Sequence, residues 1–402
     1  MEQLEFEAAT EEVKRAFIKL AKQQISGTVV KVDEDHLEQT DSSESSDSNL
    51  ESASEDLETE EGQWRVGTIN ITTVLQAFRN TCFQKFIDGE SLGATELMSL
   101  NYIYHFDVYG KTDCRGYLPG TFDEIEAEVL EDLEQNEQLS LLPEAIKAMC
   151  NMLKDATAID RAKPTEMNSM MLKANGPQEL LAARALCKLY AKYEKDEDLM
   201  LMDEDTFADH TIKPLYETLI STISRASSAG QFATMICKNK GEKDWILRPD
   251  STLCTTMIGK SIPCFTMEIK APHGPFGGDL LKISYEMKQM LNSLVEQNVE
   301  DPVVFGAVVE GVHIKTYKMD LKYHHTYRLI QLRSFYLPRE RSDFGVVEGA
   351  LMAMFQLRAL ISETVAKIRQ QPVETEQTKA MKSWRRHSPF APNFKYGVEY
   401  LD

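Results

Sequence analysis

"FTMEIKAP", residues 265 to 272, has the pattern of a buried strand that also carries two charges. Phe265, Met267 and Ile269 are apolar, whereas Glu268 and Lys270 are charged and lie two positions apart. Because successive side chains of a strand point to opposite faces, the two charges share one face. Burying them is costly unless they pair or serve a chemical purpose.

The segments upstream of this stretch predict a strand pair and a helix. Residues 244 to 259 form two short strands on either side of Pro249-Asp250. Residues 203 to 224 have apolar side chains at helical spacing, and Pro214 fits there only in the first turn or at a kink.

The segments downstream alternate between helix and strand. A Gly-rich turn leads into a helix over 279–297, and residues 302–311 form a continuous apolar run that predicts a central strand covered on both faces. Strands over 312–321 and 326–337 and a helix over 346–368 follow. We therefore expect an α/β core over residues 203–370, with a mixed β-sheet flanked by helices.

The N-terminal half divides into three predicted parts. Residues 1–32 form an amphipathic helix, residues 33–62 form a disordered linker, and residues 63–202 form a helical accessory region that could bind protein partners. Four segments carry the helical periodicity of the third part: 71–87, 121–134, 142–156 and 177–193. Thr121 is the expected cap of the second.

The linker carries most of the net charge of the chain. Of the formal −20, residues 33–62 supply 13 negative charges and no positive ones, which leaves about −7 for the remainder. Such a segment buries too little apolar surface to offset its ordering entropy. Its serines between Ser42 and Ser54 fit an acid-directed kinase, or the segment is a solubilising spacer.

Cysteine use and hydropathy favour an intracellular protein, in the nucleus or the cytoplasm. The seven cysteines include no Cys-x-x-Cys pair, which argues for reduced thiols and against structural zinc. The first residues lack the pattern of a secretory signal, and no apolar run approaches the roughly 20 residues that span a membrane.

The charges of the opening stretch become chemically meaningful beside Asp250. Mg²⁺ or Mn²⁺ is held by one or two carboxylates with waters and phosphate oxygens. Asp250 at a strand end and Glu268 on the next strand could supply them, and Lys270 could orient a water or neutralise charge on a phosphate. Alternatively, Glu268 and Lys270 form a plain ion pair and Asp250 is a turn residue.

At these residues the chain resembles the PD-(D/E)XK nuclease superfamily. "RPD" at 248–250 matches the first half of its motif and "EIK" at 268–270 the second, and the order of helix, strand pair, strand, helix and strand is similar to its restriction-endonuclease-like core. The continuation through residue 338 looks like a fungal branch of such proteins. The likeness covers roughly residues 203 to 370.

The resemblance implies a role for each matching residue. Asp250 and Glu268 would bind the metal together with the backbone carbonyl of Ile269, and Lys270 would be the catalytic lysine. A glutamate from the first core helix often joins them, for which we name Glu217. Some members carry a Gln and then a Tyr four residues later in the following helix. Here Gln289 is followed by Ser293, so that feature is not reproduced.

Other polar groups near the core have simpler interpretations. Residues 274–279 could bind a phosphate at a helix N-terminus or be a turn capped by Asp279. We interpret His273 as a turn residue, and His324 and His325 as solvated loop residues whose side chains diverge.

The C-terminal tail, residues 371–402, has the opposite charge bias. Its segment 378–396 contains five Lys or Arg residues and no acid, with aromatic residues between them. Such a segment can hold single-stranded nucleic acid, or it can dock on its own domain through its aromatic residues or contact the acidic linker. The residues named for nucleic-acid binding are Lys382, Trp384, Arg385 and Arg386.

Two hypotheses of function follow. The first is a Mg²⁺-dependent nuclease acting on DNA through Asp250, Glu268 and Lys270. The second is a catalytically inactive protein of the same fold that serves as an interaction module for proteins or nucleic acid. The mild acidity of the core favours the second, because active nucleases present a basic groove.

Overall fold

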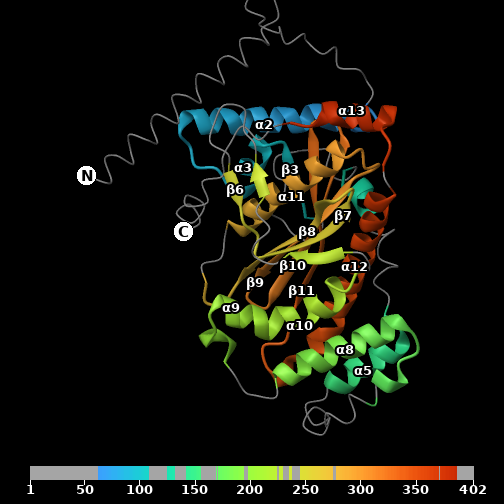
Figure 1. Ribbon diagram of the computed structural model, residues 1–402. Helices are drawn as coiled ribbons and strands as arrows, with labels where there is room; N and C mark the ends of the chain where they lie inside the picture. The colour runs from blue at the N-terminus through green and yellow to red at the C-terminus, as the bar shows by residue number, and fades with distance from the viewer. Residues whose placement is uncertain are drawn as a thin grey trace, which may run out of the picture. The chain divides into compact units, whose positions relative to one another are not determined.

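The computed structural model describes most of the chain between residues 62 and 386 (Figure 1). The described residues are 62–107, 125–131, 142–154, 169, 171–193, 198–223, 226–229, 235–237, 245–274, 278–370 and 372–386. The predicted helix over 1–32, nearly all of the acidic linker and the proposed cap Thr121 lie outside them. The chain divides into two units: residues 1–61 with 83–91, and residues 62–82 with 92–402. Of the first unit only 83–91 are described, as the end of one helix and the turn after it. All contacts below belong to the second unit.

A seven-stranded mixed sheet forms the centre of the second unit, and this confirms the predicted α/β class. Antiparallel pairing predominates, but β8 pairs parallel with β9, and β11 pairs parallel with β3. The central position of β9 agrees with its apolar run. The strands, in spatial order, are β3 (Ile103–Phe106), β11 (Thr326–Tyr336), β10 (His313–Tyr323), β9 (Val303–Glu310), β8 (Lys260–Lys270), β7 (Ser251–Met257) and β4 (Ala226–Ala229).

Two long helices cover the two faces of this sheet (Figure 1). Helix α11 (Asp279–Glu296) packs on β8 and β9, and Gly306 of β9 makes the close approach possible. A Cβ at Gly306 would lie only 2.6 Å from Sδ of Met287 and 2.9 Å from Cδ1 of Ile283. Helix α12 (Val347–Arg369) packs on the opposite face.

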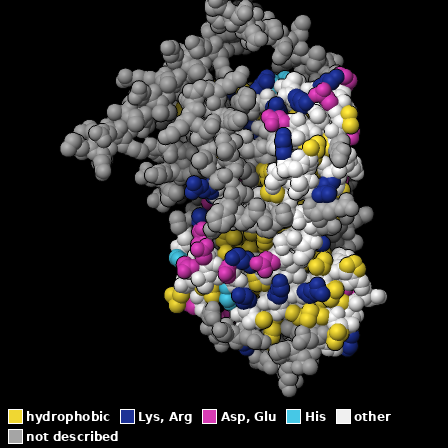
Figure 2. Space-filling view, in the orientation of Figure 1, with side chains coloured by type: hydrophobic (Ala, Val, Ile, Leu, Met, Phe, Trp, Pro, Cys, Tyr) yellow, Lys and Arg dark blue, Asp and Glu magenta, His cyan; other side chains and the backbone are white. Residues whose placement is uncertain are grey.

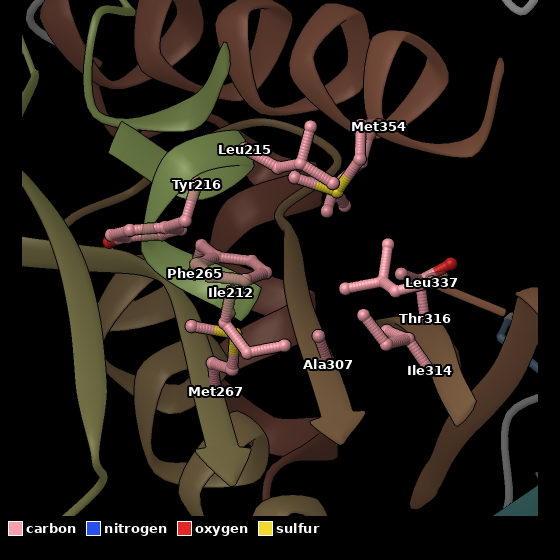
Figure 3. Close-up of a pocket in the computed structure, with 11 residues that line it drawn as sticks. Ile212, Leu215, Tyr216, Phe265, Met267, Ala307, Ile314, Thr316, Leu337 and Met354 are labelled. Atoms are coloured by element: carbon pink, nitrogen blue, oxygen red, sulfur yellow. The ribbon is translucent and has the colours of Figure 1, made fainter. Parts of the chain in front are cut away.

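The face that meets α12 is mostly apolar at its centre, with Thr316 as a polar residue among the apolar ones. Phe265 and Met267 of β8 and Ala307 of β9 face Leu215 and Met354 across a small cavity (Figure 3). The helical stretch Arg341–Arg369 is long and apolar enough, by composition, to cross a membrane, contrary to the expectation from the sequence. Its apolar side chains are instead used in the core, because thirteen residues of α12 are buried against the fold.

The first core helix is continuous but irregular. It runs through α9 (Glu204–Phe207), a π-helical turn (Ala208–Ile212), α10 (Lys213–Leu215) and a second π-helical turn (Tyr216–Ile220). Pro214 lies between the two wide turns. This position agrees with a proline at an irregularity, because a regular helix would clash with its ring.

The N-terminal half is less separate than predicted. Three predicted helices appear as α2 (Ile71–Asp88), α5 (Glu144–Lys154) and α8 (Pro177–Lys192), with α3 (Ala94–Leu100) in addition, and residues 125–131 are helical. However, β3 extends the main sheet beside β11, so a region expected to be a helical accessory supplies an edge strand. Two small hairpins, β1 (Arg65–Val66) with β2 (Ile69–Asn70) and β5 (Met235–Cys237) with β6 (Trp245–Leu247), lie outside that sheet.

The turn between β9 and β10 is fitted to the end of β8. The amide of Gly311 donates to the carbonyl oxygen of Lys270 at 2.9 Å. Gly311 has a φ of +60°, and a Cβ there would lie 3.2 Å from Cα of Pro272. This position therefore needs glycine both for its backbone conformation and for space.

Candidate functional site

Strand β8 directs its charges toward α11, as its alternation predicts. Phe265 and Met267 line the apolar cavity on the α12 side (Figure 3). On the other face the hydroxyl of Thr266 donates to Oε2 of Glu286, a residue of α11, at 3.0 Å. Glu268 and Lys270 follow Thr266 with the same parity, so both belong to the α11 face.

Asp250 is brought directly against this strand. It immediately precedes β7, and its Oδ2 accepts a hydrogen bond from the amide of Ile269 at 2.7 Å. Its charge is close enough to raise the pKa of both Glu268 and Lys270, in each case as a smaller cause beside burial. The three residues predicted from the motif therefore come together at the ends of two neighbouring strands.

Lys270 bridges the triad and the first core helix. Its Nζ donates to Oε2 of Glu204 at 3.1 Å and to the carbonyl oxygen of Ile269 at 3.3 Å. Burial lowers the pKa of Lys270, but the charges of Asp279, Glu204 and Asp250 outweigh it, so the pKa is raised overall. The lysine is therefore a firmly charged donor beside the carbonyl that the resemblance names as a metal ligand.

Helix α11 contributes three charged side chains to the same place. Asp279, Lys282 and Glu286 are spaced three and then four residues apart, which places them along one side of a helix. Nζ of Lys282 donates to Oε2 of Glu268 and, at 3.1 Å, to the carbonyl oxygen of Arg248. The cap of α11 is Gly278, in a left-handed conformation, and not the predicted Asp279. Asp279 is the first helical residue and is buried, where the charges of Lys270 and Lys282 oppose the burial that raises its pKa.

Glu268 and Glu286 form a buried carboxyl pair. The two carboxyl groups lie close enough that each affects the pKa of the other, and both residues are at most 1% exposed. Burial raises the pKa of each, and the negative charge of Glu286 raises that of Glu268 further, against the effect of Lys282. Among the described residues, Oε1 of Glu268 and Oε1 of Glu286 have no hydrogen-bond partner. Two buried acceptors without a donor are costly to leave in a folded protein.

Glu217 is not brought to this cluster in the described structure. It lies in the second π-helical turn, 56% exposed, and its ion pair is with Lys188 of α8 at 4.0 Å. The glutamate that the first core helix supplies is Glu204, at the start of α9, through Lys270. From α11, Lys282 and Glu286 approach the triad, and not Gln289.

The basic residues of the tail are engaged within the chain. They belong to α13 (Glu376–Trp384) and the two residues after it. Lys382 pairs with Glu374 and Arg385 with Glu296, each at 2.6 Å, and the amide of Arg386 donates to the Tyr327 hydroxyl at 3.2 Å. The indole of Trp384 lies against Gly62, where a Cβ would come within 2.6 Å of it. Residues 387–402 are outside the described part of the chain.

The paired histidines differ from their prediction. The rings of His324 and His325 do not diverge, because their centroids are 3.5 Å apart. His325 is buried with a φ of +54°, and burial, followed by the charges of Arg386 and His324, lowers its pKa to about 2. It is a neutral core residue and not a solvated one. His273 is an exposed turn residue, as expected.

Two observations bear on whether these residues could hold a divalent cation. In the part of the chain that the structure describes, no group of three or more His, Cys, Asp or Glu side chains has an arrangement suited to hold a metal. Mg²⁺, however, requires only one or two carboxylates and takes its remaining ligands from water and phosphate. Asp250 and Glu268 meet that minimum, and the buried Oε1 of Glu268 is an acceptor with no donor among the described residues.

The pattern of the motif did not identify Lys282, Glu286 or Glu204. The sequence did contain a signal for Lys282 and Glu286. Together with Asp279 they form a row of charged residues beside the apolar stripe of an otherwise buried helix. Comparisons of the chain with family models, with curated proteins and with solved structures gave no match. The likeness to the PD-(D/E)XK superfamily therefore depends on the residues of this chain alone.

Proposed function

We propose that this protein is a Mg²⁺-dependent nuclease, with Mn²⁺ as a substitute, that hydrolyses phosphodiester bonds in DNA. One observation carries the proposal: Asp250, from the segment before β7, lies against β8 beside Glu268 and Lys270, with its Oδ2 2.7 Å from the amide of Ile269. The surrounding order of first core helix, β7, β8, α11 and β9 is similar to the core of the PD-(D/E)XK superfamily.

Each residue of the triad would have a distinct role. Asp250, Glu268 and the carbonyl of Ile269 would hold the cation, which when bound neutralises phosphate charge and makes a water more acidic. Lys270 would place a positive charge at the phosphate or orient the attacking water. Glu204, by accepting from Lys270 at 3.1 Å, fixes where that ammonium lies.

The experiment is metal-dependent cleavage of plasmid and single-stranded DNA by the full chain. Asp250→Asn, Glu268→Gln and Lys270→Met keep the size of each side chain, and each should lower cleavage by at least about a hundredfold. Glu217→Gln is the matched control, because Glu217 pairs with Lys188 away from the triad, and it should cut like the wild type. Equal cleavage by all four variants would refute the proposal, provided that circular dichroism shows them folded.

A second function, a non-cleaving interaction module, is favoured by how closed the site is. The Glu268 side chain is 1% exposed, and its Oε2 is already bonded to Lys282. In the view of Figure 2, acidic side chains gather in the area of α9 and a short row of Lys and Arg side chains lies beside them, so the two signs of charge adjoin. Binding of DNA or a protein by the wild type, without cleavage in Mg²⁺ or Mn²⁺, would favour this function.

The basic segment Lys382 to Arg386 would supply DNA contacts in either case, since exposed ion pairs are weak and phosphates can replace their carboxylates. We further propose a nuclear or cytoplasmic location. Five of the described cysteines, Cys82, Cys150, Cys187, Cys254 and Cys264, are free thiols, as expected in a reducing compartment. Fractionation of cells that express a tagged chain tests this directly.

A further inference from the structure

The α11 side of the candidate site holds more carboxyl groups than ammonium groups among the described residues. Asp250, Glu268 and Glu286 are close enough that each affects the Lys282 ammonium, and Lys282 is the cation that contacts this group directly. Lys270 is committed to Glu204 and lies toward Asp279. Among the described residues, one ammonium therefore faces three carboxyl groups in a region where Glu268 and Glu286 are almost completely buried.

The hydrogen bonds of this group are also incomplete. Oε2 of Glu268 accepts from Lys282, and Oε2 of Glu286 accepts from Thr266. The second oxygen of each carboxyl, Oε1, is buried and has no donor among the described residues. Both glutamates therefore have one oxygen satisfied by the protein and one oxygen left for another group.

The position of Lys282 explains how the protein tolerates this arrangement without metal. Its Nζ contacts a carboxylate oxygen of Glu268 and the backbone carbonyl oxygen of Arg248, which are hard oxygen ligands of the kind that Mg²⁺ and Mn²⁺ prefer. The lysine is 22% exposed, so its head group can withdraw toward solvent along its flexible stem.

We propose that Glu286 is a further carboxylate ligand of the cation site and that Lys282 is its internal counter-ion, which a divalent cation displaces. This inference rests on the proposed function, because it assigns new residues to the same site. The cation site would then be formed by helix α11 as well as by β8 and the segment before β7, which carry the motif. Lys282 is thus a positioning residue that holds the carboxylates together until a metal arrives.

The test is a titration of the full chain with Mn²⁺ in the absence of substrate. The concentration of free Mn²⁺ is measured by electron paramagnetic resonance. Lys282→Met removes the competing charge at nearly constant length and should tighten Mn²⁺ binding on the order of tenfold. Glu286→Gln should weaken it by a similar factor. Lys188→Met and Glu217→Gln are matched controls from an exposed pair elsewhere, and neither should change the affinity.

A second measurement protects the test against a variant that folds poorly. Without metal, Lys282→Met should unfold at a lower temperature than the wild type, since the buried carboxyl groups lose the ammonium that Glu268 bonds. Saturating Mn²⁺ should raise its unfolding temperature by more than it raises that of the wild type. If Lys282→Met does not fold, Lys282→Gln, which keeps a hydrogen-bond donor, replaces it in both measurements.

The outcomes separate this inference from the proposed function. If the wild type binds Mn²⁺ and Glu268→Gln does not, while Lys282→Met and Glu286→Gln bind like the wild type, the inference is wrong and the nuclease proposal stands. If Lys282→Met binds more weakly, the lysine supports the metal instead of competing with it, and the inference is also wrong. If the wild type binds no Mn²⁺, both fail.

Discussion

Replacement of Gly306 by alanine tests how α11 is seated on the sheet. The added methyl group would lie 2.6 Å from Sδ of Met287 and 2.9 Å from Cδ1 of Ile283, whereas ordinary contacts begin at 3.4 Å. The overlaps are therefore 3.4 − 2.6 = 0.8 Å and 3.4 − 2.9 = 0.5 Å. Both neighbouring side chains are fully buried, so neither can move aside into solvent.

The size of the effect follows from two opposing contributions. Overpacking of a well-packed core costs about 1–3 kcal/mol. Alanine also restricts the unfolded chain more than glycine does, which returns about 0.4–1 kcal/mol. We expect Gly306→Ala to lower the free energy of unfolding by about 1–2 kcal/mol, because relief of both overlaps requires α11 to move outward.

The assay is guanidinium unfolding followed by far-ultraviolet circular dichroism. Gly349→Ala is the control, because a Cβ at this exposed helical position meets nothing within 4 Å. It should leave stability unchanged or raise it by up to about 1 kcal/mol. If Gly306→Ala unfolds at the same midpoint and with the same slope as the wild type, the close contact between α11 and β9 is wrong.

Two further predictions concern buried charge. His325 has a pKa lowered to about 2, so the folded protein binds fewer protons than the unfolded chain below pH 6.5, and stability is lost as the pH falls. Between about pH 6.5 and pH 5 the unfolding free energy of the wild type should fall by about 2 kcal/mol relative to that of His325→Gln. Unfolding of both proteins at several pH values measures this difference, and parallel pH profiles would contradict the prediction. Arg328, 1% exposed, donates twice to Asp320 at 2.8 Å, so Arg328→Met should cost about 3–5 kcal/mol by leaving a buried carboxylate uncompensated. Arg328→Met combined with Asp320→Leu should recover most of that loss, and a double variant no more stable than the single one would show that the ion pair is not the cause.

The sequence predicted the strand faces of the site well, because alternation in a strand is strict. The two-residue spacing of Glu268 and Lys270 was enough to place both opposite the apolar cavity, and the continuous apolar run of β9 was enough to place it in the middle. Boundaries were also close: the predicted closing helix, 346–368, is α12 at Val347–Arg369.

The first core helix shows why Glu217, which was predicted to join the triad, does not lie beside it. Each π-helical turn inserts one residue relative to a regular helix and so rotates everything after it by about 100°. Both Glu204 and Glu217 lie on this helix, but two π-helical turns begin between them, at Ala208 and Tyr216. The regular period of 3.6 residues therefore does not predict which residues share a face on the two sides of such turns.

Other features depended on contacts that no local pattern contains. The four residues of β3 are all buried, and a run that short does not distinguish a strand from part of a helix. Lys282 and Glu286 were visible as polar positions on an apolar helix, but their meaning required knowing that Glu268 lies opposite them.

The edge strand β3 also bears on how the protein can be divided experimentally. Residues 203–370 look like a self-sufficient core. However, one edge of β11 is paired with β3, which lies over two hundred residues earlier in the chain. A fragment that starts at residue 203 would expose this edge, and exposed apolar edges recruit other chains. Shortened versions should therefore begin before Ile103, and failure of a shorter one to stay monomeric would reflect a missing strand and not a missing activity.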